Sequence, residues 1–366
     1  MTSEPVPARP HAPADARPPV RAVRIHAKDD LRLDRVPEPA ASPDQAVVEV
    51  CYGGVCGSDL HYWRDGSVGT SVLRAPMVLG HEIVGRVAVP AGDGSGPPAG
   101  QAVAVHPART CGRCRWCTGG AANLCPDGRY LGSAAQWPHT DGGFADRIAV
   151  PSARLVPLPG TLGLRRAALA EPAGIAWHAT DRAQAVGAAI AGANVIVVGG
   201  GPIGLLVAAV ARHRGAATIT VTDRHERPLE VAAAVGADHA VLAADLERQP
   251  GRPGADIAFE SSGSAPGLSA AIRAARRGGT VVVVGQPPAG DVPVPASLCV
   301  AHELTMTGSL RLTSELDDAV AFLADPRPPV GPIVTHVFPA GRAAEAFALA
   351  ADPARSSKVL LDFSAP

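Results

Sequence analysis

The chain has 366 residues, a formal net charge of −1 and 46% hydrophobic residues. A chain of this length exceeds one ordinary hydrophobic core, so we expect two domains. A charge near zero gives no indication of nucleic acid or of an anionic membrane as a partner. The seven cysteines are an odd number, and four fall in one short run, which argues against the disulfide framework of a small secreted protein.

The N-terminal segment, residues 1–20, consists mostly of Pro, Ala and Arg. It lacks the apolar core of a secretory signal and cannot bury enough surface to fold, so we expect a disordered tail. The most apolar run, residues 195–211, is broken by glycines and a proline after four strand-like residues, which argues against a membrane span. The expected location is therefore the cytoplasm.

The region 21–175 has the pattern of an antiparallel β domain. Short Val-rich runs at 45–53, 83–90 and 101–107 are separated by clusters of Gly, Pro and Asp. Strands of this length with frequent turn residues are typical of small sheets that close partly into a barrel.

Three metal-binding residue types occur within this β-rich region. Cys56 lies in the segment VCGSDLHYW, and His81 and Glu82 lie in VLGHEIVGRV. One sulfur, one imidazole and one carboxylate, with a fourth position open, describe a catalytic zinc site. Glu171 adds a carboxylate in an apolar stretch, where it is costly unless it binds a metal, a water or a cation. Each residue alone also fits an ordinary core position, so the prediction depends on their joint occurrence.

Four further cysteines fall within fifteen positions. Their spacing is Cys111-x2-Cys114-x2-Cys117-x7-Cys125. Thiolates two residues apart can face one tetrahedral centre, and four of them satisfy Zn²⁺ completely, which describes a closed structural site. Iron–sulfur ligation shares part of this spacing, and unliganded thiols are the remaining alternative. The long last spacing and the rest of the chain favour structural zinc.

The segment 194–216 carries a dinucleotide-binding fingerprint. A buried β run at 195–198 is followed by Gly199, Gly201 and Gly204 and then by an apolar helix. The strand, turn and helix in this order are the context that G-x-G-x-x-G requires. The glycines permit the tight turn, the approach of the pyrophosphate and close helix–strand packing, and the helix N-terminus faces the phosphates.

The next strand ends in Asp223, nineteen residues after Gly204. A carboxylate there accepts hydrogen bonds from the ribose hydroxyls and repels a 2′-phosphate, which favours NAD over NADP. The adjacent Arg224 softens that preference, so NADP stays open, and the alternative for Asp223 is a turn residue after a strand. The expected cofactor-binding residues are Gly199, Gly201, Pro202, Ile203, Gly204, Asp223 and Arg224.

Further strand–turn segments at 254–263 and 278–288 extend the alternating pattern, which predicts a parallel, doubly wound sheet of the α/β class. After about residue 305 the chain returns to short strands and one helix. We therefore expect a β-rich catalytic domain over 21–175, completed by 305–366. A nucleotide-binding Rossmann domain over 176–304 is inserted between these parts.

Together these segments resemble the zinc-dependent medium-chain dehydrogenase/reductase superfamily. The run CGSDLHYWRDGSVGTSVLRAPMVLGHE, residues 56–82, is similar to its polyol dehydrogenase branch, which includes sorbitol, xylitol and L-idonate 5-dehydrogenases. The segments 75–82, 130–147 and 308–316 favour the L-idonate 5-dehydrogenases. The resemblance implies a GroES-like catalytic domain beside the Rossmann domain.

The resemblance also implies roles for single residues. Cys56, His81 and Glu82 match the catalytic zinc ligands, and Glu171 matches the acidic residue that holds zinc or its water. Ser58 and His61 match a proton relay. Tyr62 and Arg311 match substrate contacts, with Arg311 binding either a carboxylate or a sugar hydroxyl.

The expected activity is oxidation of a secondary alcohol of L-idonate to 5-dehydro-D-gluconate, with hydride transfer to NAD(P)⁺ and two zinc ions per chain. A sorbitol- or xylitol-type polyol dehydrogenase is the nearest alternative. A catalytically silent protein that binds NAD and zinc is the alternative from another class. The resemblance implies a small polyol or sugar-acid substrate and a homodimer or homotetramer.

Overall fold

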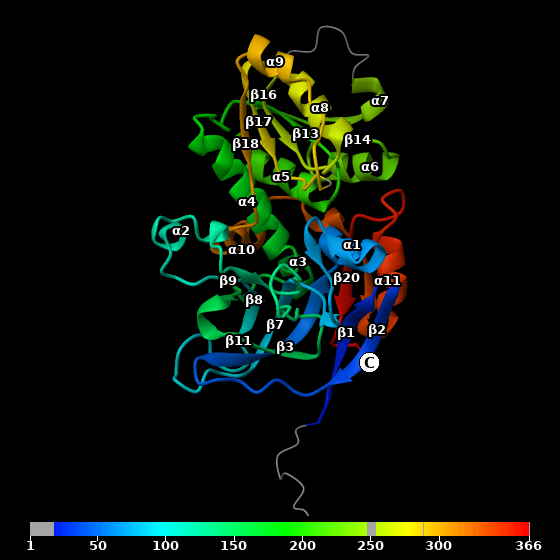
Figure 1. The fold of residues 1–366 in the computed structure, drawn as a ribbon. Helices are drawn as coiled ribbons and strands as arrows, with labels where there is room; N and C mark the ends of the chain where they lie inside the picture. The colour runs from blue at the N-terminus through cyan, green and yellow to red at the C-terminus, as the bar shows by residue number, and fades with distance from the viewer. Residues whose placement is uncertain (1–17, 247–253, 288, 366) are drawn as a thin grey trace, which may run out of the picture.

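The computed structural model describes residues 18–246, 254–287 and 289–365. The tail predicted at 1–20 lies almost entirely outside these residues, and the first strand, β1, already begins at Val20. Two halves, each built around its own large sheet, are stacked one above the other (Figure 1). Among the described residues, no helix is both long enough and apolar enough to cross a membrane.

The lower half in Figure 1 is built on a seven-stranded sheet. Its path is β12 (Leu155–Pro157), β8 (Ala102–Val105), β7 (Glu82–Val89), β3 (Gln45–Gly54), β20 (Lys358–Asp362) and β19 (Val334–Pro339), with β11 (Arg147–Pro151) also on β3. All its pairings are antiparallel except that of β19 with β20. This agrees with the β-rich pattern of the sequence.

Smaller sheets surround this one. They are β2–β1–β6 (Asp30–Val36, Val20–Ala27 and Met77–Val78), β10–β9 (Arg129–Tyr130 and Ala108–Arg109) and β4–β5 (Ser67–Val68 and Ser71–Val72). A shared core that includes Val48, Ile83, Phe144 and Phe347 lies between the sheets and α11 (Ala343–Ala350). Strand β20 pairs with β3, with Leu360 opposite Gly54, so the last segment of the chain completes this half.

The upper half in Figure 1 holds a six-stranded sheet in which every pairing is parallel. Its order is β15 (His239–Leu242), β14 (Thr218–Asp223), β13 (Asn194–Val198), β16 (Ala255–Glu260), β17 (Ala275–Val283) and β18 (Thr305–Gly308). The strand order runs outward in opposite directions from β13, towards β15 on one side and β18 on the other, and ligands of such sheets bind at the carboxyl ends of the strands beside that point. The doubly wound sheet expected from the sequence is confirmed.

The helices lie around and between these sheets. They are α1 (Gly57–Asp65), α2 (Arg115–Thr118), α3 (Leu164–Ala167), α4 (Ala170–Ala185), α5 (Pro202–His213), α6 (Glu226–Ala234), α7 (Ala243–Leu246), α8 (Ala265–Ala274), α9 (Ala296–Ala301) and α10 (Leu316–Ala324), with short 3₁₀ turns η1 (Ala122–Leu124), η2 (Ser152–Arg154), η3 (Gly331–Ile333) and η4 (Ala340–Arg342).

Helix α4 packs against α5 and α10, and it runs from the level of the lower sheet up to the parallel sheet (Figure 1). Helix α5 is apolar on nearly all sides and is buried, as a helix between a sheet and other helices must be. Strand β18 carries the parallel sheet as far as Gly308, slightly beyond the limit of 304 expected from the sequence.

Candidate active site, metal centres and nucleotide site

The donor set expected at the catalytic centre is brought together at the edge of the lower sheet. Cys56 caps the N-terminus of α1, His81 directly precedes β7, and Glu82 is its first residue. One ligand atom from each of the three lies within 4.8 Å of the others. His81 and Glu82 are buried. A thiol, an imidazole and a carboxylate at this separation fit the ligand chemistry of Zn²⁺.

A buried aspartate fixes two segments of this centre. One oxygen of Asp59 accepts the backbone N–H of Cys56 at 2.9 Å, and the other accepts that of Gly80 at 3.2 Å. Burial raises the pKa of Asp59, while the neighbouring His81 lowers it. The carboxylate therefore ties the loop before α1 to the loop before β7, and so sets the distance between the thiol and the imidazole.

Sequence reasoning missed the partner of Glu82. The ammonium of Lys358, the first residue of β20, lies 2.7 Å from each oxygen of the Glu82 carboxylate and donates to the Val55 carbonyl at 3.0 Å. Lys358 is 2% exposed and Glu82 is fully buried. The Glu82 carboxylate at the metal centre is thus neutralised by a buried cation, the Lys358 ammonium.

Glu171 faces the same centre from α4. The Tyr130 hydroxyl donates to its Oε1 at 2.6 Å, and both side chains are buried. Burial raises the pKa of Glu171 to about 7, against the opposing influence of His81. Burial and the Glu171 charge raise the pKa of Tyr130 well above its ordinary value, so the phenol keeps its proton and remains the donor. Glu171 is not part of the three-residue donor group, although it lies beside it.

A cavity of about 950 Å³ opens over this centre, between the two halves. Cys56, His81 and Glu171 line it, together with residues of the parallel sheet and of the loop after β18. Its volume is in the range of small-molecule and cofactor sites. Two of the three donors, Cys56 and His81, therefore line a pocket large enough for both a nicotinamide ring and a substrate.

Three of the four residues expected to contact substrate or move its proton line this cavity: Ser58, Tyr62 and Arg311. The Tyr62 hydroxyl accepts the Ala134 N–H at 2.8 Å, which leaves its own proton free for donation. The Arg311 guanidinium lies 4.5 Å from the centre of the Tyr130 ring. Within the described residues, no carboxylate forms a salt bridge with it.

His61 does not join the cavity. It lies on the exposed side of α1, where its Nδ1 is 2.8 Å from the Asp65 carboxylate one helical turn later. Residues four apart on a helix face one another, and this pairing turns the imidazole away from the pocket. The geometry places Ser58, but not His61, beside the donor set, so the expected relay through His61 is not supported.

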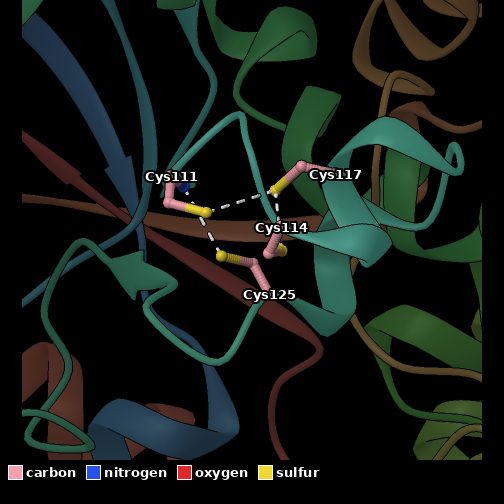
Figure 2. A group of neighbouring side chains, drawn as sticks. All are labelled: Cys111, Cys114, Cys117 and Cys125. Carbon is pink, nitrogen blue, oxygen red and sulfur yellow. Dashed lines mark hydrogen bonds between the residues drawn. The ribbon is translucent and has the colours of Figure 1, made fainter.

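The four clustered cysteines converge on one point. Cys114 caps α2, Cys117 lies within it, and Cys111 and Cys125 come from the flanking loops, with all four sulfurs turned inward (Figure 2). The Sγ atoms of Cys114 and Cys117 are 3.5 Å apart, and those of Cys111 and Cys117 are 4.0 Å apart. Four sulfurs at 2.3 Å from a tetrahedral ion lie about 3.8 Å apart, so the geometry fits one zinc.

Disulfides are excluded here, because all seven cysteines of the chain are unbridged. A 4Fe–4S cluster would place each sulfur on a different iron and so hold the sulfurs farther apart. Backbone N–H groups of Arg113 and Cys114 lower the pKa of Cys111 to about 6. The Cys111 N–H would lower the pKa of Cys125 as well, yet burial and the adjacent thiols raise it to about 11. A bound cation would offset the repulsion between neighbouring thiolates, which raises the pKa of Cys125.

A polar network missed by sequence reasoning lines the same cavity. His178 on α4 holds its Nδ1 2.6 Å from Glu315, and both residues are buried. Burial alone would raise the pKa of Glu315, but hydrogen bonds from His178 and from the Thr313 backbone hold it at about 2. Asn123, beside the cysteine cluster, donates to the Leu310 carbonyl at 2.8 Å. These contacts fix both ends of the loop that carries Arg311.

The glycine loop lies at the carboxyl end of β13, as the fingerprint requires. Gly199 has a φ of +103°, which only glycine adopts readily, and a side chain on Gly204 would collide with the Gly199 carbonyl oxygen. A side chain on Gly201, which caps α5, would meet nothing within 4 Å. The open space at the helix N-terminus can therefore receive a pyrophosphate. Pro202 is the first residue of α5, and Ile203 lines the cavity.

Asp223 ends β14 beside this loop. Its carboxylate accepts the Gly200 N–H at 2.8 Å and the His225 N–H at 2.9 Å. These contacts fix its orientation and leave lone pairs for ribose hydroxyls. Arg224 is exposed next to it. Asp223 thus lies at the carboxyl end of β14 and Arg224 directly after it, which is where the sequence predicts the ribose site.

Two family descriptions match the chain in this order. Residues 42–160 match "Alcohol dehydrogenase GroES-like domain", and residues 202–325 match "Zinc-binding dehydrogenase". The chain belongs to the zinc-dependent medium-chain dehydrogenase family. Within it, the resemblance to the polyol dehydrogenase branch is confirmed by the relatives.

Over 320 residues the chain is 35% identical to L-idonate 5-dehydrogenase (NAD(P)(+)) of Escherichia coli strain K12, which covers 87% of this chain and 91% of that protein. It is 32% identical to sorbitol dehydrogenase of Bacillus subtilis strain 168, over 83% of this chain and 86% of that one. The crystal structure of L-idonate 5-dehydrogenase from Escherichia coli K-12 superposes with a TM-score of 0.88 at 32% identity, over 94% and 98% of the two chains.

Proposed function

We propose that the protein oxidises L-idonate to 5-dehydro-D-gluconate with NAD(P)⁺ as hydride acceptor. The observation that carries the substrate assignment is Arg311. Its guanidinium lines the cavity beside the metal-binding residues and has no carboxylate partner within the described residues. A sugar acid brings such a carboxylate, and arginine binds it with two parallel hydrogen bonds. The Escherichia coli relative named for this reaction supports the same choice.

Two zinc ions per chain would be held by separate donor sets. Cys56, His81 and Glu82 would hold the catalytic ion, with Glu171 as an additional carboxylate beside it. The four-cysteine cluster would hold the structural ion. When bound, catalytic zinc supplies Lewis acidity that lowers the pKa of an alcohol hydroxyl, and the nicotinamide ring accepts the hydride.

The remaining steps belong to the side chains around the cavity. Arg311 would bind the substrate carboxylate, and the Tyr62 hydroxyl would donate to a sugar hydroxyl, which together orient the reacting carbon. Ser58 Oγ would accept the alcohol proton and release its own to water in the cavity, since His61 lies outside it. The alcohol loses one proton and one hydride in this sequence and becomes the ketone. The Tyr130 phenol keeps Glu171 hydrogen-bonded and oriented toward the centre.

The nucleotide would lie along the carboxyl ends of the parallel strands. Its pyrophosphate would bind the N-terminus of α5 at Gly201, and its ribose hydroxyls would donate to Asp223. A carboxylate fixed at that point repels a 2′-phosphate, so we infer a preference for NAD over NADP. Comparing kcat/KM for the two cofactors measures this preference directly.

The test of substrate is NAD⁺ reduction with L-idonate, D-gluconate, sorbitol and xylitol, for the wild type and for Arg311→Ala and Arg311→Lys. We expect L-idonate to be preferred, and Arg311→Ala to raise its KM about 10- to 100-fold while changing that for sorbitol little, because only the acid loses a charged partner. Arg311→Lys should recover part of the loss. An equal effect of Arg311→Ala on L-idonate and sorbitol would contradict the carboxylate role.

A polyol without a carboxylate is the second candidate, supported by the similarity to sorbitol dehydrogenase. A preference for sorbitol or xylitol in the same assay would keep the metal and nucleotide sites and assign Arg311 to hydroxyl binding. Absence of turnover with all four compounds, together with a full metal content, would favour a silent binding protein.

We also propose that the chain forms a homodimer or homotetramer and acts in the cytoplasm, where a reducing environment preserves its unbridged thiols. Light scattering on the zinc-loaded protein measures the oligomeric state.

A further inference from the structure

A second cavity, of about 300 Å³, lies in the lower half beside the first one. Leu131 lines both cavities. Three arginines line the second cavity, Arg109 from β9, Arg129 from β10 and Arg154 from η2. The cavity therefore collects positive charge from three separate elements, and no role in turnover accounts for it.

Two of these arginines are direct cross-strand partners. In the two-stranded sheet β10–β9, Arg129 lies opposite Arg109. Like charges directly opposite each other in an antiparallel pair are destabilising. Arg129 donates only to oxygens of Pro138 and Thr140, and within the described residues no salt bridge reaches either guanidinium. The sheet thus holds two cations side by side, and no described carboxylate forms a salt bridge with either.

The third arginine is partly desolvated and incompletely bonded. Arg154 Nε donates to the His106 carbonyl at 2.7 Å, while its Nη2 is shielded from solvent and has no hydrogen-bond partner. Burial, together with the positive charge of Arg109, lowers the pKa of Arg154 to about 10. A buried donor without an acceptor is costly, and a ligand oxygen is the usual remedy.

Of the acidic residues, Asp141 alone among the described ones lines this cavity, and its Oδ1 is already committed to the Val78 N–H at 2.8 Å. Three guanidinium groups against one carboxylate leave a surplus of two positive charges. His139 lines the cavity as well. A doubly charged tetrahedral oxyanion balances this surplus, whereas a monocarboxylate balances only half of it.

We propose that the Arg109–Arg129–Arg154 cavity binds a phosphate group. Guanidinium groups match the oxygens of phosphate with paired hydrogen bonds, and the volume suits inorganic phosphate or a small phosphate monoester. The site is separate from the nucleotide site, which lies at the N-terminus of α5 in the other half.

The site is linked to the substrate pocket by one hydrogen-bonded residue. His106 connects the arginine cavity with the substrate pocket through two hydrogen bonds. Its carbonyl accepts a hydrogen bond from Arg154, and its Nε2 donates to the Thr313 carbonyl at 2.7 Å. The Ala108 N–H donates to its Nδ1 and so fixes that tautomer. Thr313 belongs to the loop that carries Arg311. An anion bound to Arg154 therefore lies within reach of the loop that binds substrate.

The test measures binding without turnover. Isothermal titration calorimetry and thermal unfolding of the zinc-loaded protein are followed with inorganic phosphate and, separately, with glycerol 3-phosphate, at constant ionic strength set by chloride. We expect saturable binding of at least one of them, and a melting temperature that rises with its concentration, as binding to the native state alone requires. Binding of inorganic phosphate would show that the free ion is sufficient as a ligand of the cavity. Binding of glycerol 3-phosphate alone would show that the ligand is a phosphate ester.

The variant Arg109→Gln/Arg129→Gln should raise Kd about 10- to 100-fold, since it removes two charged partners. Its matched control, Arg32→Gln/Arg35→Gln, removes two exposed charges from β2 and should bind as the wild type does. Arg154 is left unchanged because its removal threatens folding. Two results would overturn the proposal: no binding of either compound, or equal binding by the double variant and the wild type.

Discussion

The buried Lys358–Glu82 pair gives the sharpest prediction. Replacing Lys358 by Met keeps the length of the side chain and removes the ammonium that lies 2.7 Å from both carboxylate oxygens. Both groups are essentially excluded from solvent, so Glu82 would be left as an unpaired buried charge. Breaking such a pair from one side costs about 3–5 kcal/mol. Zinc on the same carboxylate offsets part of this, so the loss should be larger in the metal-free protein.

The assay is urea unfolding of the wild type and Lys358→Met, each with zinc and after chelation, with zinc content measured in parallel. The double variant Glu82→Gln/Lys358→Met removes both charges and should recover most of the stability, because neither partner is then left uncompensated. Lys28→Met, at an exposed lysine, is the control. If the free energy of unfolding of the chelated Lys358→Met protein falls by less than about 1 kcal/mol, the reasoning is refuted, since an exposed salt bridge contributes no more than that.

Three further outcomes are expected. Gly204→Ala should raise the Kd for NAD⁺ at least about tenfold in a fluorescence titration, because the new methyl collides with the Gly199 carbonyl and displaces the phosphate loop; unchanged binding would mean that the loop yields. Cys114→Ser should remove one zinc per chain by elemental analysis and lower the melting temperature, whereas a full metal content would contradict the four-sulfur site. Since the pKa of Glu315 is held at about 2, against an ordinary 4.5, its ionised form contributes stability that is fully present above pH 4.5 and is lost as the pH falls toward 2. The difference in unfolding free energy between the wild type and Glu315→Gln should shrink over that window, and a constant difference would argue against the His178 pair.

The spacing of residues in the sequence was sufficient to predict the geometry of those parts of the site that lie on one continuous stretch of chain. The cysteines at 111–125 and the glycines at 199–204 carry their geometry in their sequence separation, because a short loop and a strand–turn–helix unit each have few ways to fold. Cys56 and His81 were predicted as metal donors for a different reason. Neither has a diagnostic local pattern, and their joint occurrence with a familiar surrounding motif identified them.

The residues that were missed act across the fold. Lys358 reaches Glu82 only because β20 pairs with β3, and Tyr130 reaches Glu171 only because β10 folds back toward α4. An isolated lysine before the apolar run VLL was the available signal, since a lysine at the start of a buried strand needs a partner. His61 shows the converse. Its neighbourhood in sequence suggested the pocket, while its helical partner Asp65 holds it outside.

The pairing of β20 with β3 also has a consequence for the order in which the protein can be made. Lys358 and Val55, which are in contact in the folded chain, are separated by 303 positions. On a ribosome, the whole parallel sheet has emerged before β20 exists, because its last strand ends at Gly308. Domains fold as they emerge, so the nucleotide-binding half can fold first. Until β20 is made, the sheet of the catalytic half has an unpaired strand edge at β3. The cation that neutralises Glu82 is therefore delivered after the parallel sheet, and the metal centre reaches its final charge only once β20 has been made.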